Sequence, residues 1–212
     1  MSQMPCKLLI LGTGPHAIEM AEIVERVNRQ HPRWEFIGLV SPHGKSIGEA
    51  RGTARVVGGP EALDDHPAAR VAPEYGWPAE MLPSRERLAS LVDPTAFVSA
   101  TATVGAGCVI YPNCFVGSNV RIGDHVFCLS GSVVNHDVVL GDRVTLATNV
   151  SVAGEVRVEP RCYLGQGCSI RQQLTIGCES QIGMGAVVIE DVAPRSVMVG
   201  NPARLLRSVD PG

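Results

Sequence analysis

Residues 104–128 read VGAGCVIYPNCFVGSNVRIGDHVFC, and every sixth position of this stretch is Val or Ile until Cys128. An α-helix repeats every 3.6 residues and a simple strand every two, so neither produces a period of six. Short strands joined by tight turns and wound into a solenoid do produce it, with the aliphatic side chains stacked inside. The period runs without a slip through Val92, Val98, Val104, Ile110, Val116, Ile122, Cys128, Val134, Leu140, Leu146, Val152, Val158, Leu164, Ile170, Ile176, Ile182 and Val188.

The composition agrees with a narrow solenoid and argues against several functional classes. The chain has 212 residues and is 45% hydrophobic but only 4% aromatic, which suits a bore that stacks Val and Ile and excludes rings. A net charge of -3 and a pI near 6.1 argue against a nucleic-acid binder, which usually presents a basic face. No apolar run approaches the roughly 18 residues of a membrane span, and the N-terminus lacks a signal-peptide layout. We therefore expect a cytoplasmic protein without a membrane span.

The cysteines are predicted to be small core residues rather than disulfide or zinc partners. Cys108, Cys114, Cys162 and Cys168 occupy the fifth position of their hexapeptides. If three hexapeptides make one coil, residues 18 apart stack, and no two cysteines have this spacing. Paired-cysteine zinc spacing is also absent from the sequence, so the pattern indicates buried thiols in a reducing compartment.

Residues 1–90 follow a different pattern, which predicts a Rossmann-like α/β domain. Strands are expected at 7–11 and 36–40, with an amphipathic helix between them at 17–28. Further elements are expected as short strands at 56–57 and 69–72 and as a closing helix at 85–91. The solenoid then spans 91–193, and the tail at 194–212 is expected to form a turn and a short helix. The apolar side of the first helix is predicted to consist of Ile18, Ala21, Ile23, Val24 and Val27.

Two motifs carry a resemblance to a known family. Residues 199–204, VGNPAR, match the Val-Gly-x-Pro-Ala-Lys/Arg ending of the hexapeptide acyltransferases, and residues 92–206 resemble their left-handed parallel β-helix with 18-residue coils. An α/β domain before the β-helix is similar to the branch of sialic-acid O-acetyltransferases and nucleotide-4-aminosugar N-acetyltransferases. Residues 135–141, NHDVVLG, match that branch's His, acid and aliphatic-Gly step. The resemblance implies an acetyl-CoA-dependent O- or N-acetyltransferase acting on a sugar or nucleotide sugar.

Acetyl transfer from a thioester needs a base for the acceptor's proton and a hydrogen-bond donor for the oxyanion. The resemblance implies that His136 is the base, and an imidazole suits this task because it titrates near neutrality. The adjacent carboxylate of Asp137 would stabilise the protonated ring. Gly154 lies 18 residues after His136, and the resemblance implies that its N–H meets the oxyanion. Direct transfer is favoured over a covalent route, because most of the cysteines in the repeat occupy core positions.

The resemblance also implies how the co-substrate is bound. Acetyl-CoA is expected in a cleft between two β-helices of a homotrimer, in contact with Thr145, Gln166 and Met184, and no metal is expected. Relatives often carry a second His at the position of Thr145. Arg204 and Arg207 are candidates to meet the phosphates of the coenzyme. Aromatic residues expected to flank the contacts between subunits are Tyr111, Phe115, Phe127 and Tyr163.

The acceptor is expected to meet the turn Gly12-Thr-Gly14-Pro15-His16, where helix-start amides could approach a nucleotide sugar. Relatives usually carry Gly where this chain has Pro15, and Pro is also common as the first residue of a helix. Two further sequence motifs that relatives carry in the nucleotide pocket are absent from this chain, which departs from them at residues 40–42 and 72–76. The identity of the acceptor and the choice between oxygen and nitrogen therefore stay open.

Other functions remain as alternatives. A non-catalytic β-helix scaffold would bind no thioester. A zinc site of the γ-carbonic-anhydrase kind needs three imidazoles, whereas the repeat contains only His125 and His136. A dinucleotide-dependent dehydrogenase is disfavoured, because the third Gly of its fingerprint is missing and no acid ends the second strand.

Overall fold

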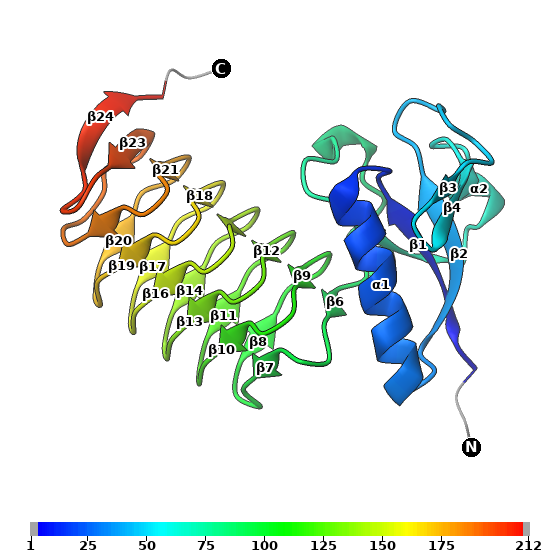
Figure 1. Ribbon diagram of the computed structural model, residues 1–212, viewed down its shortest axis with the longest axis horizontal. Helices are drawn as coiled ribbons and strands as arrows, with labels where there is room; N and C mark the ends of the chain where they lie inside the picture. Colours follow the sequence, from blue (N-terminus) through cyan, green and yellow to red (C-terminus); the bar gives the residue numbers. More distant parts are fainter. Residues whose placement is uncertain (1–3, 210–212) are drawn as a thin grey trace. The chain divides into compact units, whose positions relative to one another are not determined.

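The computed structural model describes residues 4–209 and divides into two compact units, Met1–Pro94 and Thr95–Gly212. Figure 1 shows an α/β arrangement in the first unit and a stack of short strands in the second.

The first unit is built on a five-stranded sheet with the order β3-β4-β2-β1-β5. Neighbouring strands are parallel except for β3, which runs antiparallel to β4. The two strands and the helix predicted before residue 41 are confirmed, each slightly longer than expected. The elements are β1 (Cys6–Leu11), α1 (Pro15–Gln30), β2 (Trp34–Val40), β3 (Ala50–Arg51), β4 (Ala54–Gly58), α2 (Ala62–Asp65), β5 (Arg70–Pro73), η1 (Ala79–Met81), η2 (Arg85–Arg87) and β6 (Leu91–Val92).

The core of this unit forms around β1. Residues 8–11 are an unbroken aliphatic run and are fully buried, as expected for a parallel strand covered on both faces. Helix α1 packs an apolar stripe inward, of which Ala21, Ile23 and Val24 were predicted from the sequence and are buried. Ile18 and Val27, also predicted there, are only half-buried.

The predicted closing helix at 85–91 is wrong. Only Arg85–Arg87 form a single 3-10 turn, and the chain then becomes extended. The N–H of Ala89 donates to the carbonyl of Val71 at 2.8 Å, so this segment pairs with the edge of β5 instead of bonding to itself. The guanidinium of Arg87 fixes the turn by donating to the carbonyls of Leu63, His66 and Ala69.

The second unit is a parallel β-helix, which confirms the solenoid inferred from the period of six. Paired strands join residues 18 apart, for example Val116 with Val134 and Val134 with Val152. Three hexapeptides therefore make one coil, and each contributes a strand to one of three sheets. The first sheet contains β7 (Phe97–Val98), β10 (Phe115–Val116), β13 (Val133–Val134), β16 (Ser151–Val152), β19 (Ser169–Ile170) and β22 (Val187–Val188). The second contains β8 (Thr103–Val104), β11 (Arg121–Ile122), β14 (Val139–Leu140), β17 (Arg157–Val158) and β20 (Thr175–Ile176). The third contains β9 (Val109–Ile110), β12 (Phe127–Cys128), β15 (Thr145–Leu146), β18 (Tyr163–Leu164) and β21 (Gln181–Ile182).

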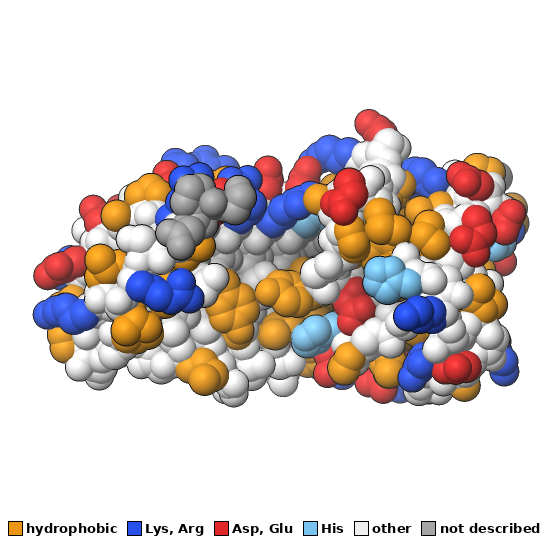
Figure 2. Space-filling view, turned by 90° about the horizontal axis from the view of Figure 1, so that it is seen from above, with side chains coloured by type: hydrophobic (Ala, Val, Ile, Leu, Met, Phe, Trp, Pro, Cys, Tyr) orange, Lys and Arg blue, Asp and Glu red, His pale blue; other side chains and the backbone are white. Residues whose placement is uncertain are grey.

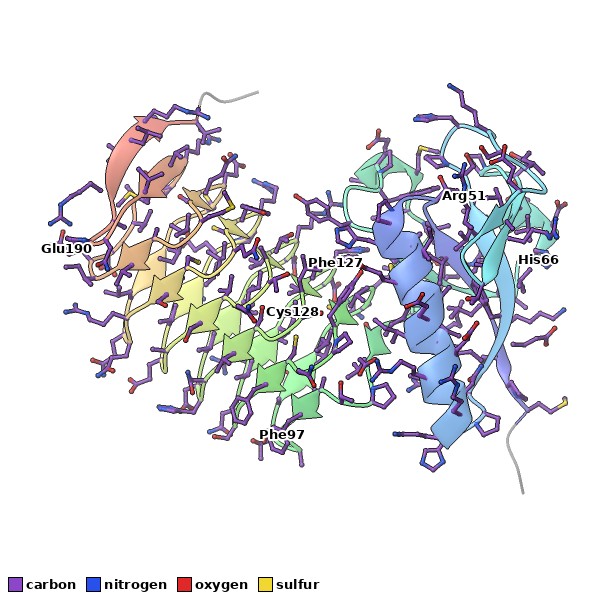
Figure 3. The ribbon with its side chains drawn as sticks, in the orientation of Figure 1. Arg51, His66, Phe97, Phe127, Cys128 and Glu190 are labelled. Carbon is purple, nitrogen blue, oxygen red and sulfur yellow. The ribbon has the colours of Figure 1, made fainter. Side chains whose placement is uncertain are left out.

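The bore of the β-helix is filled by the repeated aliphatic residues. From Ile110 to Val188, none of these six-spaced positions is more than 5% exposed. Cys128 lies inside the coils with them (Figure 3). The fifth-position cysteines are buried, as predicted. Burial raises the pKa of Cys162 to about 11 and that of Cys168 to about 12, which keeps both thiols protonated at neutral pH.

The corners of the coils use a left-handed backbone conformation. This conformation costs an ordinary residue about 1–2 kcal/mol, and Gly, Asn and Asp tolerate it best. The N–H of the corner residue donates to a carbonyl one coil earlier, as from Asp137 to Ser118 and from Glu155 to His136. These bonds offset the strain and join consecutive coils. Non-glycine corner residues with φ between 56° and 62° are Asn113, Asn119, His125, Asp137, Arg143, Asn149, Glu155, Arg161, Gln173 and Glu179.

The predicted short helix in the tail is wrong. The chain instead forms β23 (Ser196–Val199), which pairs in parallel with β21, and β24 (Arg204–Ser208), which returns antiparallel to β23. The hairpin extends the third sheet by hydrogen bonding, which a helix could not do. Residues 210–212 of the predicted tail lie outside the described residues.

Ile170 and its neighbour Ser169 in β19 provide a test of the stacked bore, because Ile170 is 2% exposed and Ser169 is exposed. We expect Ile170→Ala to lower the free energy of unfolding by about 2–5 kcal/mol, since it leaves a cavity in the stack. Ser169→Ala is the matched control and should change it by less than about 0.5 kcal/mol. Urea unfolding followed by circular dichroism measures both, and equal small effects would contradict the packing described here.

Candidate functional site

His136 and Gly154 occupy the same corner of successive coils, 18 residues apart. This corner, called the His136 corner, consists of Ser118-Asn119, His136-Asp137 and Gly154-Glu155. It lies between the first and second sheets, since each of its turns follows a strand such as β13 and precedes a strand such as β14. The side chain of His136 is 58% exposed and that of Asp137 is 47% exposed, so both groups project outward from the β-helix.

The imidazole of His136 is oriented by a carboxylate. Its Nδ1 lies 2.9 Å from Oδ2 of Asp137, and the other oxygen of that carboxylate accepts a 3.0 Å hydrogen bond from Nδ2 of Asn119. The hydrogen bond from His136, and then that from Asn119, hold the pKa of Asp137 below its usual range. An ionised carboxylate can only accept, so Nδ1 of the neutral ring carries the hydrogen. Nε2 therefore keeps a lone pair and can take up a proton.

The imidazole of His136 packs directly against the backbone of Gly154. A Cβ added at Gly154 would lie 2.5 Å from both Cε1 and Nε2 of His136, which is closer than real contacts allow. The glycine is therefore required for the observed position of the imidazole. Among residues 4–209, none accepts a hydrogen bond from the Gly154 N–H. The corner thus presents a proton acceptor beside an available backbone donor.

Asn119 is a member of this cluster that the sequence reasoning missed. It lies 18 residues before Asp137, at the same corner position of the preceding coil, and the coil period alone could have identified it. Its amide donates to the carboxylate oxygen of Asp137 that does not contact the histidine. The three side chains form a continuous chain of hydrogen bonds, from Asn119 through Asp137 to His136.

The residues assigned to the coenzyme lie elsewhere on the β-helix. Gln166 and Met184 occupy consecutive coils at a different corner, where the Gly185 N–H donates to the Gln166 carbonyl at 2.9 Å. Gln166 is exposed, and Met184 is 78% exposed. Thr148 lies one coil before Gln166 at this corner, called the Gln166 corner. Strand β16 of the first sheet connects Thr148 to Gly154 at the His136 corner, so the first sheet separates the two corners. In one chain, the two sets of residues are therefore not brought together.

Thr145 and Arg204 also lie away from His136. Thr145 is in β15, in the sheet that leads to the Gln166 corner, and is only 6% exposed. Arg204 begins β24 and is exposed, while its Nη1 donates to the carbonyl of Ala203. Arg207 is exposed in the same strand.

The aromatic residues expected at subunit contacts fall into two groups. Tyr111 and Phe127 are 4% and 3% exposed, so neither presents much surface in the single chain. Phe115 and Tyr163 are 40% and 39% exposed and remain candidates. Phe97, which the sequence reasoning did not include, projects outward and stacks on Phe115 with ring centroids 5.1 Å apart (Figure 3).

The turn assigned to the acceptor contains a carboxylate from the same chain. Gly14 is the N-cap of α1 and Pro15 is its first residue, as the helix-start interpretation predicted. Glu74, directly after β5, accepts hydrogen bonds from the N–H groups of Gly14 and Ala17, at 3.3 Å and 3.2 Å. His16 lies beside it, with Nδ1 3.0 Å from the carboxylate of Glu19.

The described residues contain neither a metal-binding cluster nor a membrane-spanning helix. Within residues 4–209, no group of three or more His, Cys, Asp or Glu side chains could hold a metal ion. In the same range, no helix has the length and apolar character to cross a membrane. On the face shown in Figure 2, acidic and basic side chains are interspersed, as expected for a chain of net charge -3.

Comparison with known proteins finds short matches in sequence. No protein-family model matches the chain. Mitochondrial serine acetyltransferase 3 of Arabidopsis thaliana is 49% identical over 47 residues, which cover 22% of this chain and 12% of that protein. A Schizosaccharomyces pombe protein named as an acetyltransferase is 36% identical over 53 residues, 25% of this chain and 26% of that protein. The chain therefore spans about an eighth and about a quarter of these curated relatives.

Solved structures match almost the whole chain. The acetyltransferase domain of PglB from Neisseria gonorrhoeae, in complex with acetyl coenzyme A, is 24% identical, with a TM-score of 0.82 over 95% of this chain and 100% of that one. A mutant perosamine N-acetyltransferase from Caulobacter crescentus, in complex with CoA and GDP-perosamine, is 24% identical, with a TM-score of 0.83 over 95% and 97%. WeeI from Acinetobacter baumannii is 25% identical, with a TM-score of 0.79 over 96% and 100%. The expected resemblance to hexapeptide acetyltransferases is thus confirmed at the level of the fold.

Gly154→Ala tests the geometry of the His136 corner. The backbone of Gly154 is not in the left-handed region, so we expect the β-helix to fold normally, while the new methyl group displaces the imidazole. The Cε1–H resonance of His136 should shift in proton–carbon correlation spectra, with circular dichroism unchanged. Ser118→Ala, at the same corner position one coil before His136 and two coils before Gly154, is the matched control and should leave that resonance in place. An unmoved resonance in Gly154→Ala would show that the ring does not rest on Gly154.

Proposed function

We propose that this protein transfers the acetyl group of acetyl-CoA to a hydroxyl or amine of a sugar or nucleotide sugar. The observation that carries the proposal is the His136 corner, where an imidazole oriented by Asp137 lies against the backbone of Gly154. The sequence matches to acetyltransferases support it. Further support comes from structural neighbours that hold acetyl coenzyme A, or CoA with GDP-perosamine.

His136 is the general base of the proposed reaction. Asp137 holds the hydrogen on Nδ1, so Nε2 takes a proton from the acceptor as the acceptor's oxygen or nitrogen attacks the thioester carbonyl. The carbonyl oxygen becomes an oxyanion, and the N–H of Gly154 donates to it. The carbon–sulfur bond then breaks, and the leaving thiolate takes the proton from the imidazolium. His136 returns to its neutral form, and the products are the acetylated acceptor and CoA.

The proposed active site requires two copies of the chain. The His136 corner and the Gln166 corner lie at opposite edges of the first sheet, so one pantetheine arm cannot contact both in a single chain. A homotrimer in which the His136 corner of one β-helix faces the Gln166 corner of the next would unite them. The exposed Met184, together with Gln166 one coil before it, then lines the pantetheine channel.

His136→Ala tests the catalytic assignment. We expect turnover to fall by about 10²–10⁴, the typical contribution of a positioned base, with the affinity for acetyl-CoA little changed. Asp137→Asn should cost less, because the ring keeps its lone pair and loses only its orienting carboxylate. Acetyl-CoA turnover is measured against a panel of amino sugars, free sugars and nucleotide sugars.

The matched control is His125→Asn, which replaces the other histidine of the repeat with a residue that tolerates the left-handed corner. It should leave turnover within about twofold of wild type, because His125 lies in the turn between β11 and β12, at a different corner from His136. Unaltered turnover in His136→Ala would place the chemistry elsewhere. Failure of the wild-type protein to bind acetyl-CoA would favour the scaffold alternative.

Mixing two inactive variants tests whether the site is shared between subunits. His136→Ala lacks the base, and Met184→Glu places a charge in the proposed pantetheine channel. Co-refolding them in equal amounts should restore activity to about a quarter of the wild-type sites, because random assembly pairs an intact His136 with an intact Met184 at one interface in four. Sedimentation should show trimers. A mixture no more active than either variant would contradict a shared site.

A further inference from the structure

The start of α1 contains a cradle formed by two glycines. Gly12 has φ of +133°, and its N–H donates to the carbonyl of Val40 at 2.9 Å, so the chain turns sharply between β1 and the helix. Gly14 follows as the N-cap. Glycines at such a turn leave space in which a ligand can approach the backbone.

Glu74 fills that space. A Cβ added at Gly12 would lie 2.0 Å from Oε2 of Glu74, and one added at Gly14 would lie 2.6 Å from Oε1. The two glycines therefore accommodate a side chain of their own chain. The carboxylate also accepts hydrogen bonds from the N-cap and third-residue amides of α1, two of the groups that a helix leaves without an intrahelical partner.

The electrostatics of the position lead to the same conclusion. The amino end of a helix carries a partial positive charge that attracts one anion, and here the carboxylate of Glu74 supplies it. A second carboxylate, Glu19, lies just past the first turn of α1, where it bonds to His16. The hairpin that carries Arg51 approaches this turn, since a Cβ at Gly52 would lie 2.6 Å from Ile18. The guanidinium of Arg51 donates from Nη2 to Ser46 and Glu49, while its buried Nε has no hydrogen-bond partner among residues 4–209.

We infer that Glu74 is a specificity-determining residue that occupies the amino end of α1 in place of a phosphate, so that the acceptor carries no phosphate group there. The statement about the acceptor rests on the proposed function, whereas the position of Glu74 at the helix end does not depend on it. A phosphate would have to displace a carboxylate held by two amides and would meet its negative charge. The acceptor class is therefore a sugar or related hydroxyl or amine compound without a nucleoside diphosphate bound at α1.

Calorimetric titration with GDP, UDP and inorganic pyrophosphate tests the inference, using the full chain without coenzyme because CoA itself carries phosphates. Wild type should show no saturable binding. Glu74→Ala vacates the cradle and should bind these anions saturably, since an anion at a helix amino end gains about threefold to thirtyfold in affinity. Glu74→Gln still fills the space and should bind less tightly than Glu74→Ala.

Glu19→Ala is the matched control, because it removes a carboxylate from the same helix, just past its first turn, without opening the cradle, and it should behave as wild type. Thermal melting of the wild-type protein needs no variant and should be unaffected by the three anions. Saturable binding by wild type that Glu74→Ala does not strengthen, or a melting temperature of wild type that rises with anion concentration, would overturn the inference. Neither measurement involves His136 or acetyl-CoA, so its failure is distinguishable from failure of the proposed acetyl transfer.

Discussion

The ladder of hydrogen bonds between residues 18 apart is the interaction on which the rest of the β-helix depends. Each two-residue strand is too short to be stable alone and is held by its neighbours on the coils before and after it. The ladder places His136 directly below Gly154 and Asn119 directly below Asp137. The geometry of the His136 corner is thus a consequence of coil stacking, and a rigid scaffold orients a side chain that is itself largely exposed.

Much of this architecture was predictable from the sequence, because its physical cause is local and repeated. The buried aliphatic residue in every hexapeptide predicted the bore, and the period predicted that His136 and Gly154 would meet. The corners left a signal too: Asn, Asp and Gly recur at the position with positive φ, as at Asn113, Asn119 and Gly131. The same reasoning, applied one coil before Asp137, identifies Asn119 as its partner.

The remaining features depend on contacts that no period encodes. Glu74 reaches the helix start from 60 residues further along the chain, and sequence alone suggested only that an expected motif was missing there. The tail forms β23 and β24 because an open sheet edge was available for pairing, which its own residues do not reveal. The sequence of residues 85–91 likewise favours a helix, but the carbonyl of Val71 offers their backbone a partner outside the segment. In each case, tertiary hydrogen bonding decided the local conformation.

The fixed coil length also restricts how such a chain can change over evolutionary time. The loss or gain of one residue within a coil would shift the register of every later residue by one position. Val152 would then point outward, and a polar neighbour would point into the bore. Whole coils, by contrast, can be duplicated or deleted without disturbing the interior, because each coil contacts only its neighbours. The gene of such a protein should therefore lengthen or shorten this region in steps of 54 nucleotides, three for each of the 18 residues in a coil. Surface loops of the α/β unit carry no such restriction.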